Sequence, residues 1–134
     1  MEAAVLIRKR MQAYFVEGED NCAMSSLKIL AEHFEMPPMP QAVAAARHVP
    51  GAGGAGEACG LVLGVLMFIG IWGAHHSYSR QRLNPLARRV TAHVHRRFGS
   101  LCCRDLQRES GCAPLATEML STLIPLLAEE MAAL

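Results

Sequence analysis

The hydrophobic pattern of the chain is dominated by one continuous apolar run, from Ala58 to Ala74, that carries no charged residue. As a helix these 17 residues would be about 25 Å long, which is the lower end of what a membrane span needs. Glycines at 60, 64, 70 and 73 lower the hydrophobicity of the run, and the chain has no second run of this length. We therefore predict a buried central helix rather than a membrane span. A helix that is apolar on every side should be covered on every side.

The segments before and after this run have apolar residues at helical spacing, separated by glycine, proline and capping residues. No useful stretch shows the alternation typical of a β-strand. We predict an all-α fold, a compact bundle of six or seven helices around the central helix at 58–74, in a single domain spanning 1–134. The predicted flanking helices cover 2–16, 22–34, 41–48, 86–98 (capped by Asn84 and opened by Pro85) and the segment that begins at Pro114.

Composition and charge narrow the class of protein. The 13 basic and 12 acidic residues give a net charge of +1, so the total charge indicates no general attraction to polyanions. Aromatic residues make up only 5% of the chain, which disfavours a base-stacking surface for nucleic acid. The first residues lack the continuous apolar core of a secretory signal, and we expect a cytoplasmic protein with reduced thiols.

Five cysteines are the candidate chemical groups, and their positions share a feature. Cys22, Cys59 and Cys112 each lie at or just before a predicted helix start, and Cys103 lies in a short turn. The helix dipole and the free N–H groups of a first turn favour thiolates, so several such starts aimed at one place suit a cluster or a soft metal. The alternative is that the cysteines are small buried hydrophobic residues. The chain has no C-x-x-C, which excludes the local signatures of zinc ribbons, thioredoxins and c-type haem attachment.

A glycine-rich loop leads into Cys59. Gly51, Gly53 and Gly56 fit the dinucleotide pattern G-x-G-x-x-G, but an alanine-rich helix stands where that pattern needs a strand. We interpret the loop instead as flexible backbone with free N–H groups beside Cys59. Gly60 and Gly64, four residues apart on one helix face, predict a close helix crossing. The predicted cofactor-binding glycines are Gly53, Gly54, Gly56 and Gly60.

Four pieces of sequence together resemble the C-GCAxxG-C-C family of redox-active proteins. They are NCAMSSLKILAEHF, GEACGLVLGVLMFIG, FGSLCCRDL and the final Gly-Cys pair, and they extend over nearly the whole chain. The resemblance implies that the family's four cysteines are Cys22, Cys59, Cys103 and Cys112, with Cys102 as an extra one.

The same pieces are similar to the N-terminal part of split-Soret cytochromes. That similarity implies an iron–sulfur cluster, of the 2Fe–2S kind, held by the same four thiolates. It also implies a homodimer. Haem is not implied, because the chain contains no C-x-x-C-H.

Two other functions remain open at this point. In a thiol–disulfide protein, Cys103 and Cys112 would form the better pair, because a bond between the adjacent Cys102 and Cys103 strains the peptide. In a helical binding domain the cysteines would hold zinc or no metal, and the basic segment 80–108 would dock an acidic partner. His75 and His76, at the end of the central helix, are expected in a surface turn rather than on a metal. No acid–base pair or nucleophile with a partner is visible, so we expect an electron carrier or redox module rather than an enzyme.

Overall fold

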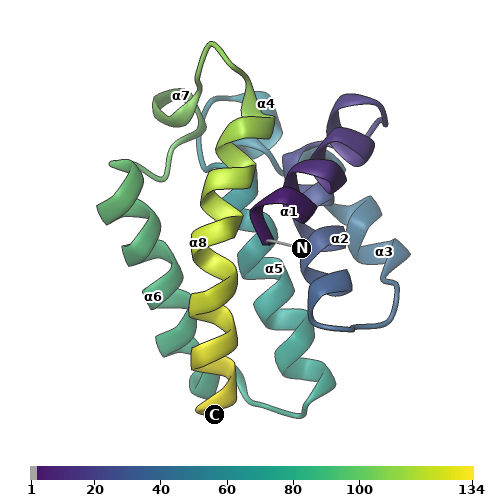
Figure 1. Ribbon diagram of the computed structural model, residues 1–134. Coiled ribbons are helices and arrows are strands. Elements are labelled where there is room, and N and C mark those ends of the chain that lie inside the picture. Colours follow the sequence, from purple (N-terminus) through teal and green to yellow (C-terminus); the bar gives the residue numbers. More distant parts are fainter. Residues whose placement is uncertain (1–2) are drawn as a thin grey trace.

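The computed structural model describes residues 3–134, and within them the fold is all-α, as the sequence predicts (Figure 1). The helices are α1 (Ala3–Met11), α2 (Cys22–His33), α3 (Pro40–Ala45), α4 (Gly51–Gly54), α5 (Gly60–His75), α6 (Arg80–Phe98), α7 (Cys103–Leu106) and α8 (Cys112–Ala132). A π-helical turn, Gln12–Val16, continues α1, and a 3-10 turn, Ala46–His48, follows α3. None of the helices in this part of the chain combines the length and the apolarity that crossing a bilayer requires.

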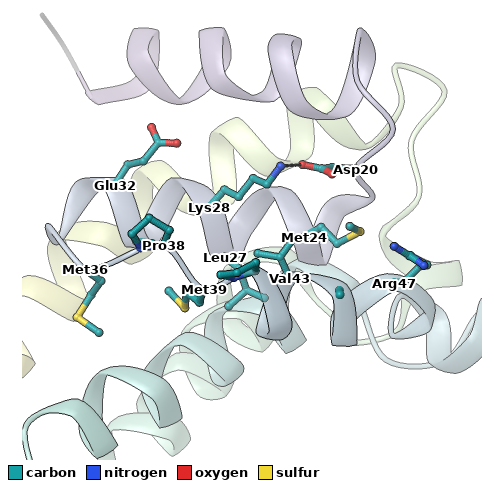
Figure 2. A pocket seen from close by; sticks show the side chains of 13 residues that line it. Asp20, Met24, Leu27, Lys28, Glu32, Met36, Pro38, Met39, Val43 and Arg47 are labelled. Atoms are coloured by element: carbon teal, nitrogen blue, oxygen red, sulfur yellow. Dashed lines mark ion pairs between the residues drawn. The ribbon is translucent and has the colours of Figure 1, made fainter.

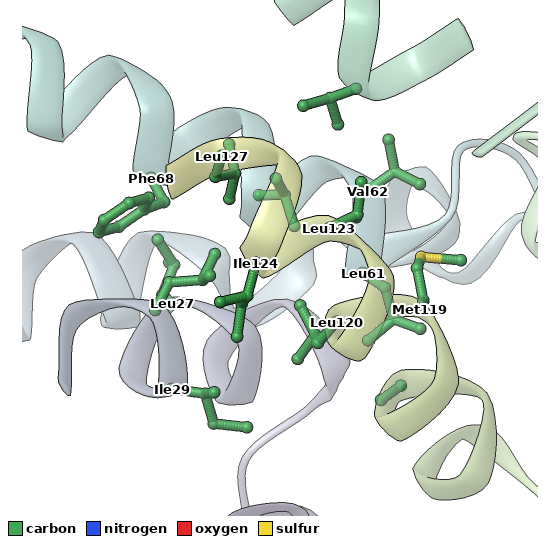
Figure 3. Close-up of a cluster of buried hydrophobic side chains, with 14 of the residues drawn as sticks. Leu27, Ile29, Leu61, Val62, Phe68, Met119, Leu120, Leu123, Ile124 and Leu127 are labelled. Carbon is green, nitrogen blue, oxygen red and sulfur yellow. The ribbon is translucent and has the colours of Figure 1, made fainter. Parts of the chain in front are cut away.

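The predicted central helix is α5. It lies between α2 and α6, with α8 passing in front of it in the view of Figure 1. Fully buried side chains such as Phe68 of α5, Leu27 of α2 and Leu120 of α8 form one continuous core, shown in Figure 3. Their burial supplies the main stabilising free energy of such a bundle.

Glycines set the distance between α2 and α5. A Cβ atom added to Gly64 would lie 2.9 Å from the Ala23 carbonyl oxygen and 3.0 Å from Ser26 Cβ. A larger residue would force the two helices apart. The close crossing predicted at Gly60 and Gly64 is therefore confirmed.

The predicted start of the helix over 86–98 is wrong, because α6 begins earlier, at Arg80. Ser79 is its N-cap and accepts a hydrogen bond from the Arg82 N–H at 3.2 Å. Leu83 of this first turn packs directly onto Gly73, where a Cβ would lie 2.0 Å from Leu83 Cδ1. Packing against α5 thus stabilises a first turn of α6 that the sequence prediction, based on Pro85 as the start, left outside the helix. Pro85 itself lies exposed within α6.

The expectation that α5 is covered on every side is also wrong. Along one face, Leu63, Leu66, Met67 and Ile71 are only partly buried, and Gly70 and Ala74 are exposed. These six residues are called the α5 face below. The other helices cover α5 on its remaining sides, and this face lies between the flanks covered by α2 and α6.

Candidate thiol site

Four cysteines from separate parts of the chain line one small cavity of about 10 Å³. They are Cys22, Cys59, Cys103 and Cys112, and they are called the cysteine site below. Gly60, Leu61, Leu106, Gln107 and Leu115 complete the lining, which is therefore mostly apolar. The structure thus brings together the four cysteines that the sequence singled out.

Capping of α2 positions Cys22. Asn21 is the N-cap residue, and its side-chain oxygen accepts a hydrogen bond from the Met24 N–H at 2.9 Å. The same amide group donates to the carbonyl oxygens of Ala46, at 3.1 Å, and Arg47, at 2.8 Å. Cys22 is therefore the first residue of a helix whose start is fixed to the 3-10 turn.

Cys59 and Cys103 are held together by backbone pairing between two loops. The Cys59 N–H donates to the Leu101 carbonyl oxygen at 2.8 Å, and the Cys103 N–H donates to the Glu57 carbonyl oxygen at 2.5 Å. Ala58 and Cys102 form an antiparallel bridge at the same place. This pairing brings the N-terminal end of α5 beside the α7 turn.

Gly60 allows the sulfur of Cys22 to approach α5. A Cβ atom on Gly60 would lie 2.4 Å from Cys22 Sγ and 2.8 Å from Pro50 Cβ. No side chain fits there unless the sulfur or the proline moves. The glycine is thus a steric requirement of the site.

The electrostatics of the site oppose deprotonation of three of its thiols, Cys22, Cys59 and Cys112. Burial, followed by the nearby Cys59, Cys112 and Cys103, raises the pKa of Cys22 from 9.0 to about 12. Burial also raises the pKa of Cys59 and Cys112, although the backbone N–H groups of Val62 and Leu61 stabilise the Cys59 thiolate. Desolvation, together with repulsion between neighbouring thiolates, thus raises the pKa of these cysteines by more than the free N–H groups at a helix start lower it.

Gln107 is a residue of the site that the sequence analysis missed. Its Nε2 lies 3.7 Å from Cys103 Sγ and donates a hydrogen bond to that sulfur. The available signal was its position four residues after Cys103, directly after the short helix α7. Hydrogen bonds to sulfur tune the potential of thiolate-bound metals.

Cys102 does not line the cavity. It is the N-cap residue of α7, and its N–H donates to Ser100 Oγ at 3.0 Å. All five cysteines are free thiols.

Among the predicted glycines, only Gly60 lines the cavity. Gly53 and Gly54 have positive φ angles and open space around their Cα atoms, while the Gly56 carbonyl accepts from the Arg104 N–H at 3.1 Å. The loop thus helps to fix the α7 turn through its backbone. Its role in cofactor binding stays a prediction.

The donor set of the site is four sulfurs with no carboxylate or imidazole among the lining residues. Thiolates of this kind suit iron–sulfur clusters, zinc and other soft metals. Across residues 3–134, no three His, Cys, Asp or Glu side chains are arranged to hold one metal ion. The thiols converge, but in the structure they enclose a space of roughly one water molecule.

His75 and His76 lie at the other end of α5, in an exposed position as expected. His76 Nδ1 lies 2.8 Å from the Trp72 carbonyl oxygen, and its ring packs 4.4 Å from the Trp72 ring. His75 is the last residue of α5, and His76 is its C-cap residue.

A separate hollow of about 550 Å³ lies between α2 and α3, and its lining includes none of the five cysteines (Figure 2). Its floor is apolar, with Met24, Leu27 and Val43, and Lys28 Nζ lies 2.5 Å from Asp20 Oδ2 at its edge. The charged residues Glu32 and Arg47 also line the hollow.

Comparison with protein families decides the identity of the domain. The family model described as "Putative redox-active protein (C_GCAxxG_C_C)" matches residues 20–124, a range that contains all four cysteines of the site. The chain belongs to this family. No curated protein matches it, and no solved structure does.

Proposed function

We propose that this member of the C_GCAxxG_C_C family carries an iron–sulfur cluster, of the 2Fe–2S kind, on Cys22, Cys59, Cys103 and Cys112, and transfers electrons or senses redox state. The observation that supports the proposal is the convergence of these four thiols on one apolar cavity, from four separate stretches of the chain. A packing role alone would not require cysteine at all four positions.

When bound, the cluster supplies one-electron redox chemistry, and four protein thiolates leave it no open position for a substrate. In this proposal the four cysteine sulfurs bind the cluster. Leu61, Leu106 and Leu115, which also line the cavity, exclude water from it. Gln107 donates to the Cys103 sulfur, and the backbone N–H groups of Leu61 and Val62 favour the Cys59 thiolate by lowering its pKa. Because burial raises the pKa of Cys22, Cys59 and Cys112, binding of a cluster by their thiolates releases protons and becomes more favourable as pH rises.

The exposed part of the site is the part that can adjust to a cluster. Cys22 and Cys59 are buried at the close α2–α5 crossing, whereas Cys103 and Cys112 are half-buried. Gln107 is exposed and follows the four-residue helix α7. We expect α7 and the start of α8 to move on loading, while α2 and α5 stay in place.

The test is anaerobic purification followed by absorption and EPR spectra, with iron, sulfide and zinc assayed on the same sample. We expect visible bands and about two iron and two sulfide per chain. Cys→Ser changes at each of the four positions should abolish or strongly reduce the bands, and Cys102→Ser is the matched control that should keep them.

Other outcomes would overturn the proposal in favour of a stated alternative. A colourless protein with about one zinc per chain would indicate a structural zinc site. A metal-free protein that resists reconstitution and gains free thiols on mild reduction would indicate thiol–disulfide chemistry between site cysteines.

A further inference from the structure

The hollow between α2 and α3 has two walls, and each wall is one face of a helical segment. The α2 wall consists of Met24, Leu27, Lys28 and Ala31. The other wall, from α3 and the 3-10 turn after it, consists of Pro40, Val43, Ala44 and Arg47. Both sets follow the spacing i, i+3, i+4, i+7, which places each set on one side of its helix. The two faces line a space of about 550 Å³, a size typical of small-molecule sites.

Three methionines give the hollow an adaptable apolar lining. Met24, Met36 and Met39 pack against the core but are only partly buried, and they lie along the hollow in Figure 2. An unbranched thioether side chain adjusts its shape to a ligand more readily than a branched one. The lining therefore suits a flexible apolar chain.

The connection between α2 and α3 fixes one side of the hollow. It contains Pro37 and Pro38, and Pro40 is the first residue of α3. Pro38 and Pro40 line the hollow themselves. The fixed φ angle of proline limits the freedom that this segment can lose, so little conformational entropy opposes the binding of a ligand.

The charged groups around the hollow are paired, with one exception. Asp20 Oδ2 lies 2.5 Å from Lys28 Nζ. Glu32 pairs with Arg10, and the distance from Arg10 Nε to Glu32 Oε2 is 2.8 Å. The exception is Arg47, which forms no ion pair with a carboxylate of residues 3–134. The charge that the hollow offers to a ligand is therefore positive.

Arg47 and Glu32 lie at opposite ends of the hollow, with Leu27 and Val43 between them (Figure 2). A carboxylate at the Arg47 end forms a charge-assisted pair with the guanidinium group. An apolar chain attached to it then lies over Leu27 and Val43. A second carboxylate at the other end of that chain would meet the Glu32 carboxylate, so the arrangement favours a single acidic group.

We propose that the hollow between α2 and α3 binds a small monocarboxylate with a flexible saturated chain, its carboxylate on Arg47 and its chain on the apolar floor. This site is separate from the cysteine site and needs no cluster. The Arg47 carbonyl oxygen accepts a hydrogen bond from the Asn21 side chain at 2.8 Å, so the residue that holds the ligand also contacts the N-cap of α2. Binding should therefore stabilise the start of α2.

The test is an NMR titration of the full chain, labelled with ¹⁵N, with decanoate. We expect saturable shifts of amide signals in α2 and α3, with a dissociation constant on the order of 100 µM. Octanoate, shorter by two CH₂ groups, should bind about tenfold more weakly, since each buried CH₂ changes the affinity about three- to fourfold. Decanedioate should also bind more weakly than decanoate, because its second carboxylate faces Glu32.

Variants separate the two ends of the ligand, with 1-octanol as a neutral probe. Arg47→Gln changes an exposed side chain, so the fold should stay intact. It should weaken decanoate binding by about fivefold and leave 1-octanol binding unchanged. Met39→Gln makes the lining polar at nearly constant side-chain length and should weaken both ligands. Arg88→Gln, exposed on α6 and outside the lining of the hollow, is the matched control that should change neither.

The absence of saturable shifts with decanoate would overturn the proposal. Decanoate binding that Arg47→Gln leaves unchanged would overturn the carboxylate contact and indicate a neutral apolar ligand. Binding that Met39→Gln leaves unchanged would mean that the ligand lies outside the hollow. Iron and sulfide assayed on the same samples keep this test apart from the test of the cluster, because binding in the hollow should not depend on metal content.

Discussion

At the scale of single residues, glycines and cysteines define the chemistry of this protein together. Two sulfurs lie at the α2–α5 crossing, and Gly60 gives one of them the space it needs. Glycine spacing predicted the close crossing, and the family resemblance implied the four cysteines. It could not predict that the atom nearest to Gly60 would be Cys22 Sγ, because that contact joins residues 38 positions apart.

Two helical glycines of α5 should respond to alanine in opposite ways. Gly60→Ala places a Cβ 2.4 Å from Cys22 Sγ, so we expect the free energy of unfolding to fall by roughly 1–3 kcal/mol, with weaker metal loading. Gly70→Ala adds a Cβ in open space and should raise the stability of the monomer by up to about 1 kcal/mol. Denaturant unfolding of the two variants, with iron assayed after reconstitution, measures the contrast. Equal stability of the two would show that the Cys22 sulfur moves aside without cost.

At the scale of helices, the capping of α2 links a local signal to the site. Asparagine is among the residue types preferred at the N-cap position, and Asn21 is the N-cap residue of α2. Its two hydrogen bonds to the 3-10 turn were not predictable, because they join segments that the chain brings together only on folding. One residue thus caps a helix and fixes its first cysteine in space.

Removing the Asn21 cap should lower the free energy of unfolding more than removing a cap that makes no further hydrogen bonds. We expect Asn21→Ala to lower the free energy of unfolding by about 1–2 kcal/mol and to weaken metal loading, because Cys22 loses its fixed position. Ser79→Ala removes the exposed cap of α6 and should cost about 0.5–1 kcal/mol without changing metal content. Thermal unfolding and iron assays of both variants check this. If Ser79→Ala reduced metal content as much as Asn21→Ala, the effect would come from global stability and not from the position of Cys22.

At the scale of the whole molecule, α5 carries two separate features. Its N-terminal end meets α2, α7 and α8 at the cysteine site, and its uncovered side forms the α5 face. The buried thiols also make the stability of the whole metal-free protein depend on pH.

The metal-free, reduced protein should become less stable as pH rises above about 9. The folded state keeps the Cys22 thiol protonated up to a pKa of about 12, whereas the unfolded chain releases that proton near 9.0. The stabilising contribution is therefore complete below pH 9 and is lost progressively towards pH 12. Cys59 and Cys112 act in the same direction, because burial raises their pKa as well.

Urea unfolding between pH 7 and 11 measures this dependence. Cys22→Ala should flatten the loss of stability, while Cys102→Ala, outside the cavity, should follow the wild type. An unchanged pH profile in Cys22→Ala would show that the Cys22 thiol is not the group whose deprotonation opposes folding.

The sequence by itself determined the helices and the place of the central apolar helix, because periodicity and capping are local in the chain. The four candidate cysteines came from the resemblance of several sequence pieces to one family. The tertiary structure decided which cysteines meet, since pairing of the Glu57–Cys59 and Leu101–Cys103 segments joins distant loops. It also decided the early start of α6 and the uncovered side of α5. Both depend on how helices pack against one another, and an apolar pattern alone does not reveal which side of a helix is left without a neighbour.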